Sequence, residues 1–229
     1  MILTSSKQNE AARDEILASI RRNLKMSEPF DAVHREHKGH SVVTDAIVPV
    51  RKLESQNSLI EMFTQNLEMV GGHVTPVKDE SEAANCVVSV IKGIGANKIA
   101  VSGSDLVGRI VGKIEDKDFI ENADVETLFD CHLGITSAQW AIAETGTLVL
   151  ESETENHRLT SLVPAVHLCI FRASQIRQTL GEILELTGKN MSRTITFITG
   201  ASRTSDIELT LAIGVHGPGE LHVIVIDDQ

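Results

Sequence analysis

From about residue 54 onward, segments with helical spacing of apolar residues alternate with solid runs of Val, Ile and Leu. This alternation is the feature that most constrains the fold. Strands that are apolar at every position are typical of a parallel sheet covered on both faces. The sequence therefore predicts an α/β fold, with a mainly parallel sheet and helices on both faces. Strands are expected at residues 73–77, 98–103, 147–152, 166–171, 194–199 and 220–227, and helices at 54–70, 79–95, 104–114, 173–188 and 205–214.

Local signals mark several of the expected helix ends. Asp79 and Glu82 have the spacing of a capping box, and Ser104 or Asp105 begins the next helix. Glycines close two helices, at Gly71–Gly72 and at Gly188. These signals indicate where the helical segments begin and end along the chain.

The first part of the chain differs from the rest in pattern and charge. Ile16, Leu17, Ile20 and Leu24 follow helical spacing, so an amphipathic helix is expected over residues 8–25, followed by a polar linker. Residues 1–60 contain nine Lys/Arg and eight Asp/Glu, whereas the remainder contains 12 and 24. We therefore predict an N-terminal helical extension with its linker over residues 1–45 and an α/β domain over 46–229.

Composition excludes several classes of function. A formal net charge of −11, no Tyr and a single Trp argue against a nucleic-acid binder, which needs a basic face and stacking rings. No apolar run approaches the ~20 residues that cross a bilayer, and no secretory signal begins the chain, so we expect a cytoplasmic protein. Cys86, Cys131 and Cys169 are too far apart in sequence to suggest a zinc or iron–sulfur motif. Buried, reduced thiols are expected instead.

The segment "TGASRTSDIELT", residues 199–210, has the composition of an anion site. It places Gly200 after an expected strand, and Ser202, Thr204 or Ser205 would then cap a helix that starts near Asp206. Free backbone N–H groups and the helix dipole favour an anion there, and Arg203 could add a bidentate contact. The alternative is that these residues only cap the helix. The lysine of a P-loop and the pattern GxGxxG are both missing.

A second candidate surrounds Glu144, before a Thr-Gly-Thr turn. Its carboxylate could act as nucleophile, base or hydrogen-bond acceptor, and Gly146 would allow close backbone approach; the alternative is an exposed turn residue. The carboxylates at 151, 153 and 155 form a solvated face or a weak cation site that Arg158 could pair with. His216, Glu220 and His222 could bind a metal, but a turn and an ordinary strand histidine are the favoured interpretation. We therefore predict no metal site.

Three blocks of sequence together resemble the lactate-utilisation protein C family, or LUD domain. They are "GITSAQWAIAETGTLVLES", "HRLTSLVPAVHLCI" and "TGASRTSDIELTLAIGVHGPGELHVIVID", in the family's order and at close spacing. The resemblance implies a Rossmann-like fold similar to the NagB/RpiA/CoA-transferase group. It also implies a role in oxidising L-lactate to pyruvate beside two iron–sulfur proteins. Any clusters would then lie in those partners, with no cofactor in this chain.

From the residues and the resemblance together we predict Glu144 as a catalytic residue, and as ligand-binding residues Thr145, Gly146, Thr147, Arg158, Gly200, Ser202, Arg203, Thr204, Asp206 and His216. The matched positions are Glu144, Thr145, Gly146 and Thr147 in the first block, Ser161, Pro164 and His167 in the second, and Gly200, Ser202, Arg203, Thr204, Asp206, Glu208, His216, Gly217 and Pro218 in the third. Two positions depart from the family: Ala201 stands where proline is expected, and Gly219 where arginine is common. The second change removes a charge from the expected pocket rim, which leaves Arg203 and Arg158 as anion partners.

Three functions follow from these observations. The first is an accessory subunit of an iron–sulfur-dependent lactate-oxidising system, which binds a small carboxylate or phosphate at a helix N-terminus. The second is a stand-alone enzyme of the CoA-transferase or folate-ligase-like fold that uses Glu144. The third is a metabolite-sensing module without chemistry of its own.

Overall fold

The computed structural model describes residues 15, 17–19, 55–115, 117–156, 158–188, 192–205, 211–213 and 217–228. Residue contacts divide the chain into two units, Met1–Arg51 and Lys52–Gln229. In the first unit the described residues, 15 and 17–19, are helical. The rest of the helix expected over 8–25 lies outside the described residues, as does the linker. The boundary expected at residue 45 remains a prediction.

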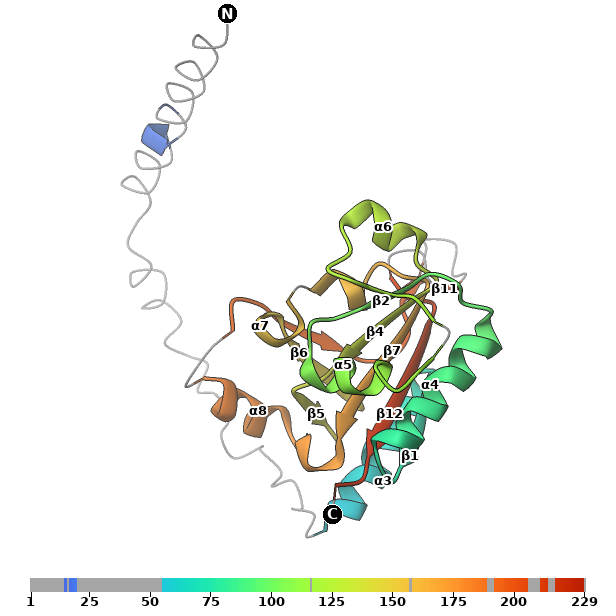
Figure 1. Ribbon diagram of the computed structural model, residues 1–229. Helices are drawn as coiled ribbons and strands as arrows, with labels where there is room; N and C mark the ends of the chain where they lie inside the picture. Colours follow the sequence, from blue (N-terminus) through green and yellow to red (C-terminus); the bar gives the residue numbers. More distant parts are fainter. Residues whose placement is uncertain are drawn as a thin grey trace, which may run out of the picture. The chain divides into compact units, whose positions relative to one another are not determined.

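A six-stranded sheet in which every neighbouring pair is parallel forms the centre of the second unit (Figure 1). Its strand order is β1-β12-β7-β4-β2-β3. The central strands β7 and β12 are almost entirely buried, as expected for strands covered on both faces. The predicted α/β class with a mainly parallel sheet is therefore confirmed. The strands are β1 Gly72–Val77, β2 Ile99–Val101, β3 Phe119–Glu121, β4 Leu133–Ser137, β7 Val166–Arg172 and β12 Glu220–Ile226.

Two helices cover one face of this sheet. In Figure 1, α4 (Glu80–Ile94) and α5 (Asp105–Val111) lie in front of the strands, and their apolar residues join one core cluster with the strands. Asp79 caps α4 by accepting hydrogen bonds from the Ser81 and Glu82 amides. The Glu82 carboxylate accepts from the Lys78 amide, 2.8 Å away, so the predicted capping box forms one residue earlier than its ideal pattern.

A helix and a second sheet cover the opposite face. Helix α3 (Gln56–Met69) and strands of the second sheet pack there in a separate core cluster. The second sheet has four strands in the order β8-β5-β6-β9, and β6 is antiparallel to both of its neighbours. The strands expected over 147–152 and 194–199 exist, but they belong to this sheet and not to the parallel one. The strands are β5 Trp140–Ile142, β6 Thr147–Glu151, β8 Ile176–Arg177 and β9 Ile195–Ile198.

The helix expected over residues 173–188 is wrong in its first half. A short 3-10 turn, η3 (Ala173–Gln175), and strand β8 precede the helix, which begins only at α8 (Leu180–Thr187). The reason is local, because Thr179 accepts a hydrogen bond from the Glu182 amide and Glu182 bonds back to the Thr179 amide. This capping box starts the helix seven residues later than its apolar spacing suggested.

The helix expected over residues 205–214 is also wrong at its described residues, 205 and 211–213. The described parts of that segment are strands β10 (Arg203–Ser205) and β11 (Leu211–Ile213), which pair antiparallel in a small sheet of their own. Residues 206–210 lie outside the described residues. Among the described residues, the pairing of Arg203 with Ile213 and of Ser205 with Leu211 takes the place of the expected helix.

The packing around α3 allows a matched test of the fold. Phe63 of α3 is fully buried, and its ring meets Phe171 edge to face with centroids 5.5 Å apart. We expect Phe63→Ala to lower the free energy of unfolding by about 3–5 kcal/mol, because it leaves a cavity in the core. Phe129→Ala, at a ring that is 73% exposed, should cost less than about 0.5 kcal/mol. Urea unfolding followed by circular dichroism measures both, and equal losses would contradict this packing.

Candidate functional site

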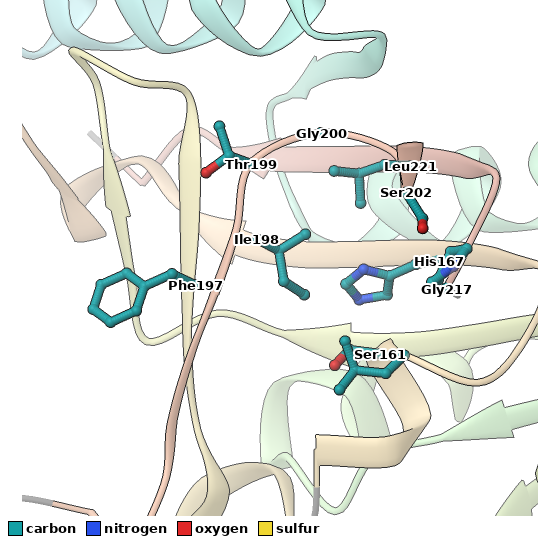
Figure 2. Close-up of a pocket in the computed structure, with 11 residues that line it drawn as sticks. Ser161, His167, Phe197, Ile198, Thr199, Gly200, Ser202, Gly217 and Leu221 are labelled. Carbon is teal, nitrogen blue, oxygen red and sulfur yellow. The ribbon is translucent and has the colours of Figure 1, made fainter. Parts of the chain in front are cut away.

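A cavity of about 210 Å³ lies between the parallel sheet and strand β9 of the second sheet (Figure 2). It borders the amino-terminal ends of β7 and β12. Ligands usually bind at the carboxyl ends of the strands in such sheets, but here, among the described strands, only β9, which belongs to the second sheet, borders the cavity with its carboxyl end. The lining residues are Ser161, Leu162, His167, Phe197, Ile198, Thr199, Gly200, Ser202, Gly217, Pro218 and Leu221.

The most unusual group in this cavity is His167. It is the second residue of β7 and is only 1% exposed. Its Nε2 atom lies 2.8 Å from the Thr136 hydroxyl oxygen, while Nδ1 is buried with no hydrogen-bond partner in the described part of the chain. Figure 2 shows the ring in the space bordered by Ile198, Ser161 and Ser202. Because an unpaired buried nitrogen is costly, this atom is a candidate contact for a ligand.

Burial also determines the charge of His167. Desolvation lowers the pKa of its imidazole from 6.5 to about 3, so the ring is neutral near pH 7. A neutral imidazole has one donor nitrogen and one acceptor nitrogen. The site can therefore offer a hydrogen bond from the ring, but no positive charge.

Ser161 reaches the cavity through a close approach of backbones. It ends the 3-10 turn η2 (Arg158–Ser161), which packs on β4. A Cβ atom placed on Gly134 of β4 would lie 2.0 Å from the Thr160 carbonyl oxygen, so only glycine fits there. The Ser161 hydroxyl donates to the Arg158 carbonyl oxygen at 2.8 Å, which holds the turn together.

Two loops form the wall of the cavity opposite Ser161. The Ser202 amide donates to the Pro218 carbonyl oxygen at 2.8 Å, which joins the segment after β9 to the turn before β12. Gly200 has φ +87°, a left-handed conformation that glycine favours. The structure thus brings the predicted Gly200 and Ser202 together with Gly217 and Pro218, and all four line the cavity.

Arg203 does not line this cavity, although it is adjacent to Ser202. Its side chain is exposed, and Nη2 donates to the Val70 carbonyl oxygen at 2.7 Å. The backbone of Thr204 is in β10, where it pairs with Ala212 of β11. The Thr204 side chain, Asp206 and His216 lie outside the described residues. The predicted anion site depended on a helix N-terminus. Over the described residues 203–205 and 211–213, strands β10 and β11 are found instead.

The Glu144 turn lies beside α3. Glu144 and Thr145 are exposed, and Glu144 is not among the cavity-lining residues. Gly146 has φ +61°, and a Cβ atom there would lie 2.4 Å from the Leu67 amide nitrogen. The backbone of Gly146 therefore lies close against helix α3. The role of Glu144 in catalysis remains a prediction.

A chain of hydroxyls connects the Glu144 turn to the cavity wall. The Thr147 hydroxyl oxygen lies 2.7 Å from that of Thr145 and 2.7 Å from that of Thr199. This contact follows from the antiparallel pairing of β6 with β9, in which Leu148 is opposite Ile198. Two predicted ligand-binding residues, Thr145 and Thr147, thus support Thr199 of the cavity wall.

The expected solvated cluster of carboxylates is wrong for Glu155. Glu155 ends the short helix α7 (Ser152–Glu155), is 2% exposed, and accepts hydrogen bonds from the Ser137 amide and hydroxyl at 3.0 and 2.5 Å. The Gln139 side-chain amide donates to the same carboxylate at 2.9 Å. Arg158 is exposed and forms no ion pair with the described carboxylates of that cluster. Glu155 therefore anchors α7 to the end of β4.

No metal centre forms among the described residues, because no three His, Cys, Asp or Glu side chains are placed to hold an ion. The His222 Nε2 atom lies 3.5 Å from a Glu220 oxygen, and its ring stacks on His73. Cys131 and Cys169 are buried, as expected for thiols, and Cys86 is half-buried. Desolvation raises the pKa of all three thiols, which makes them poor metal ligands.

Within the described residues, no helix has the length and apolar character of a membrane span.

Sequence reasoning did not select Ser161 and His167 as site residues, although the resemblance covers both. The available signal was a histidine within the apolar strand "VHLCIF". A polar residue in such a strand is either paired in the core or exposed to a cavity. The sequence could not distinguish these cases, because they depend on what covers that face of the sheet.

The neutral state of His167 predicts a pH dependence of stability. Between pH 6.5 and about 3 the unfolded chain binds a proton at this position and the folded chain does not, so stability falls as pH falls through this window. From about pH 7 to about pH 4.5, wild type should lose about 2–3 kcal/mol more unfolding free energy than His167→Gln. Urea unfolding at both pH values measures the difference, and parallel losses would contradict the buried neutral state.

Comparison with known proteins gives consistent results. The chain is 39% identical over 110 residues to an uncharacterized protein of Neisseria meningitidis, covering 47% of each chain. It is 42% identical over 95 residues to Lactate utilization protein C of Deinococcus radiodurans, covering 40% of this chain and 45% of the other. The matched segment thus spans about half the length of these relatives.

A solved structure and a family pattern extend the likeness over most of the chain. The crystal structure of a DUF162 family protein from Deinococcus radiodurans has a TM-score of 0.60 and 22% identity. The match covers 75% of this chain and 98% of that one, which supports the Rossmann-like α/β fold. Residues 60–226 match the sequence pattern of the LUD domain. Because this match covers well over half of the chain, the protein belongs to the LUD domain family.

Proposed function

We propose that this protein is a cytoplasmic accessory subunit of an iron–sulfur-dependent system that oxidises L-lactate to pyruvate. In this proposal the cavity around His167 binds a small carboxylate. The observation that carries it is the unpartnered, buried Nδ1 atom of His167 beside an open cavity. A relative that carries the name Lactate utilization protein C supports the assignment to lactate metabolism.

The lining of the cavity favours a small carboxylate with a hydroxyl group over a phosphate. The described lining residues include hydroxyl groups of serine and threonine but no Lys or Arg, so a doubly charged phosphate would cost more to desolvate there than a singly charged carboxylate. Lactate carries hydrogen-bond acceptors on its carboxylate and both a donor and an acceptor on its hydroxyl. It can therefore pair with His167 whichever nitrogen of the neutral ring carries the proton. The apolar side chains of Leu162, Ile198 and Leu221 can pack against the lactate methyl group.

The redox chemistry is assigned in this proposal to iron–sulfur partner proteins. An iron–sulfur cluster needs several thiolates close together. In this chain the three cysteines are unpaired and have raised pKa values; Cys131 and Cys169 are buried and Cys86 is half-buried. The donor set thus does not suit a cluster, and we assign no cofactor to the described residues. Co-purification of an iron–sulfur protein with the native chain would test this part of the proposal.

The two alternative functions make different predictions about the isolated chain. A stand-alone enzyme that uses Glu144 requires a substrate beside that carboxylate, yet Glu144 does not line the His167 cavity. A sensing module requires ligand binding without partner proteins of the redox chain. Turnover by the purified chain that Glu144→Gln abolishes would favour the enzyme.

Calorimetric titration of the full chain tests the proposed cavity. We expect L-lactate to bind saturably, and His167→Gln to weaken that affinity about tenfold through loss of one buried hydrogen bond. Inorganic phosphate should bind much more weakly than L-lactate, because without a positive side chain in the described lining its larger charge costs more to desolvate.

His132→Gln is the matched control, because His132 is exposed and lies outside the cavity. Its lactate affinity should stay within about twofold of wild type. Thermal melts of each variant establish that it is folded. Equal affinities of wild type and His167→Gln, or no binding of L-lactate by wild type, would overturn the proposal.

A further inference from the structure

We propose that Arg203 is a positioning residue, which holds the wall of the His167 cavity against the carboxyl-terminal end of α3. In this role Arg203 does not touch the bound carboxylate. The inference rests on the proposed function for the identity of the ligand. The sequence predicts a direct contact between Arg203 and a bound anion. The inference replaces this contact with a positioning role.

The first observation is the partner of the guanidinium group. Arg203 Nη2 lies 2.7 Å from the carbonyl oxygen of Val70, the residue that caps the end of α3. Carbonyl groups at the end of a helix lack partners within the helix, and the helix dipole makes this end partly negative. A cation is therefore favourable at this position. The contact joins residues 133 positions apart in the chain.

Two glycines make room for this contact. Gly71 has φ +85°, and a Cβ atom on it would lie 2.5 Å from Arg203 Nη2. Gly200 has φ +87°, and a Cβ atom on it would lie 2.7 Å from the Val70 carbonyl oxygen. The segment after β9 thus meets the end of α3 at two points, the Gly200 backbone and the Arg203 side chain.

The same segment forms the cavity wall. Gly200 and Ser202 line the cavity, and the Ser202 amide is bonded to the Pro218 carbonyl oxygen on the other side. Figure 2 shows the chain passing from Thr199 through Gly200 to Ser202 along the upper edge of the cavity. Residues 200–203 are therefore held between the end of α3 and the turn at Pro218. Release of Arg203 would free one side of this wall and move Ser202.

The position of Arg203 argues against direct contact with the ligand. It does not line the cavity, and its side chain is exposed. Solvent and salt would screen its charge from a carboxylate in the cavity. Its effect on binding should therefore be independent of the charge of the ligand.

A pair of ligands separates the two roles of Arg203. Calorimetric titration with L-lactate and with the neutral analogue lactamide should show that Arg203→Ala weakens both by a similar factor, about three- to tenfold. Arg203→Lys, which can still donate to the Val70 carbonyl oxygen, should restore part of both affinities. Arg193→Ala removes one exposed positive charge elsewhere and should change neither. A loss with Arg203→Ala that is confined to lactate, and that shrinks at high salt, would show direct contact and overturn the inference.

Hydrogen exchange without ligand tests the positioning role separately from the function. Arg203→Ala should speed amide exchange over residues 199–203 by about tenfold, while the amides of β7 and β12 keep their protection. Unchanged exchange in this segment would overturn the inference even if lactate binds. Faster exchange in a chain that binds no lactate would leave the positioning role standing and remove the proposed function.

Discussion

The need to cover both faces of one parallel sheet determines most of this structure. Strands β7 and β12 have apolar side chains on both faces, and neither face can be left in water without a large cost in free energy. Helices α4 and α5 cover one face. Helix α3 and the second sheet together cover the other. The His167 cavity lies where strand β9 of the second sheet meets the amino ends of β7 and β12.

His167 makes this cavity a candidate site. It occupies a core position of β7, on the same face as Cys169 and Phe171, which pack against α3 and the second sheet. A histidine in such a layer is tolerated because Thr136 pairs with one of its nitrogens. The other nitrogen lacks a partner, and the low pKa keeps the ring uncharged. Recognition at this site therefore depends on hydrogen bonds and shape, with little help from charge, which distinguishes it from an anion site built on a helix dipole.

Predictions from sequence succeeded where the signal was local or periodic. The Asp79 cap with Glu82, the apolar face of α3 and the solid apolar runs of β7 and β12 all appear in the structure as expected. They failed where two patterns overlapped. Ser205 and Asp206 resemble a helix start, while the described residues 203–205 and 211–213 pair as two antiparallel strands. Arg203 was expected to contact an anion, but it does not line the cavity and its guanidinium donates to the Val70 carbonyl oxygen.

The sequence by itself determined the α/β class, four of the six parallel strands and most helix ends, because each depends on side chains within a few residues of one another. Only the tertiary structure decided which strands form the second sheet, and that Thr147 lies opposite Thr199. It also decided that Gly200, Ser202 and Pro218 meet beside His167. These contacts join residues that are distant in the chain. They arise from how the layers pack over the parallel sheet, and no local pattern records that packing.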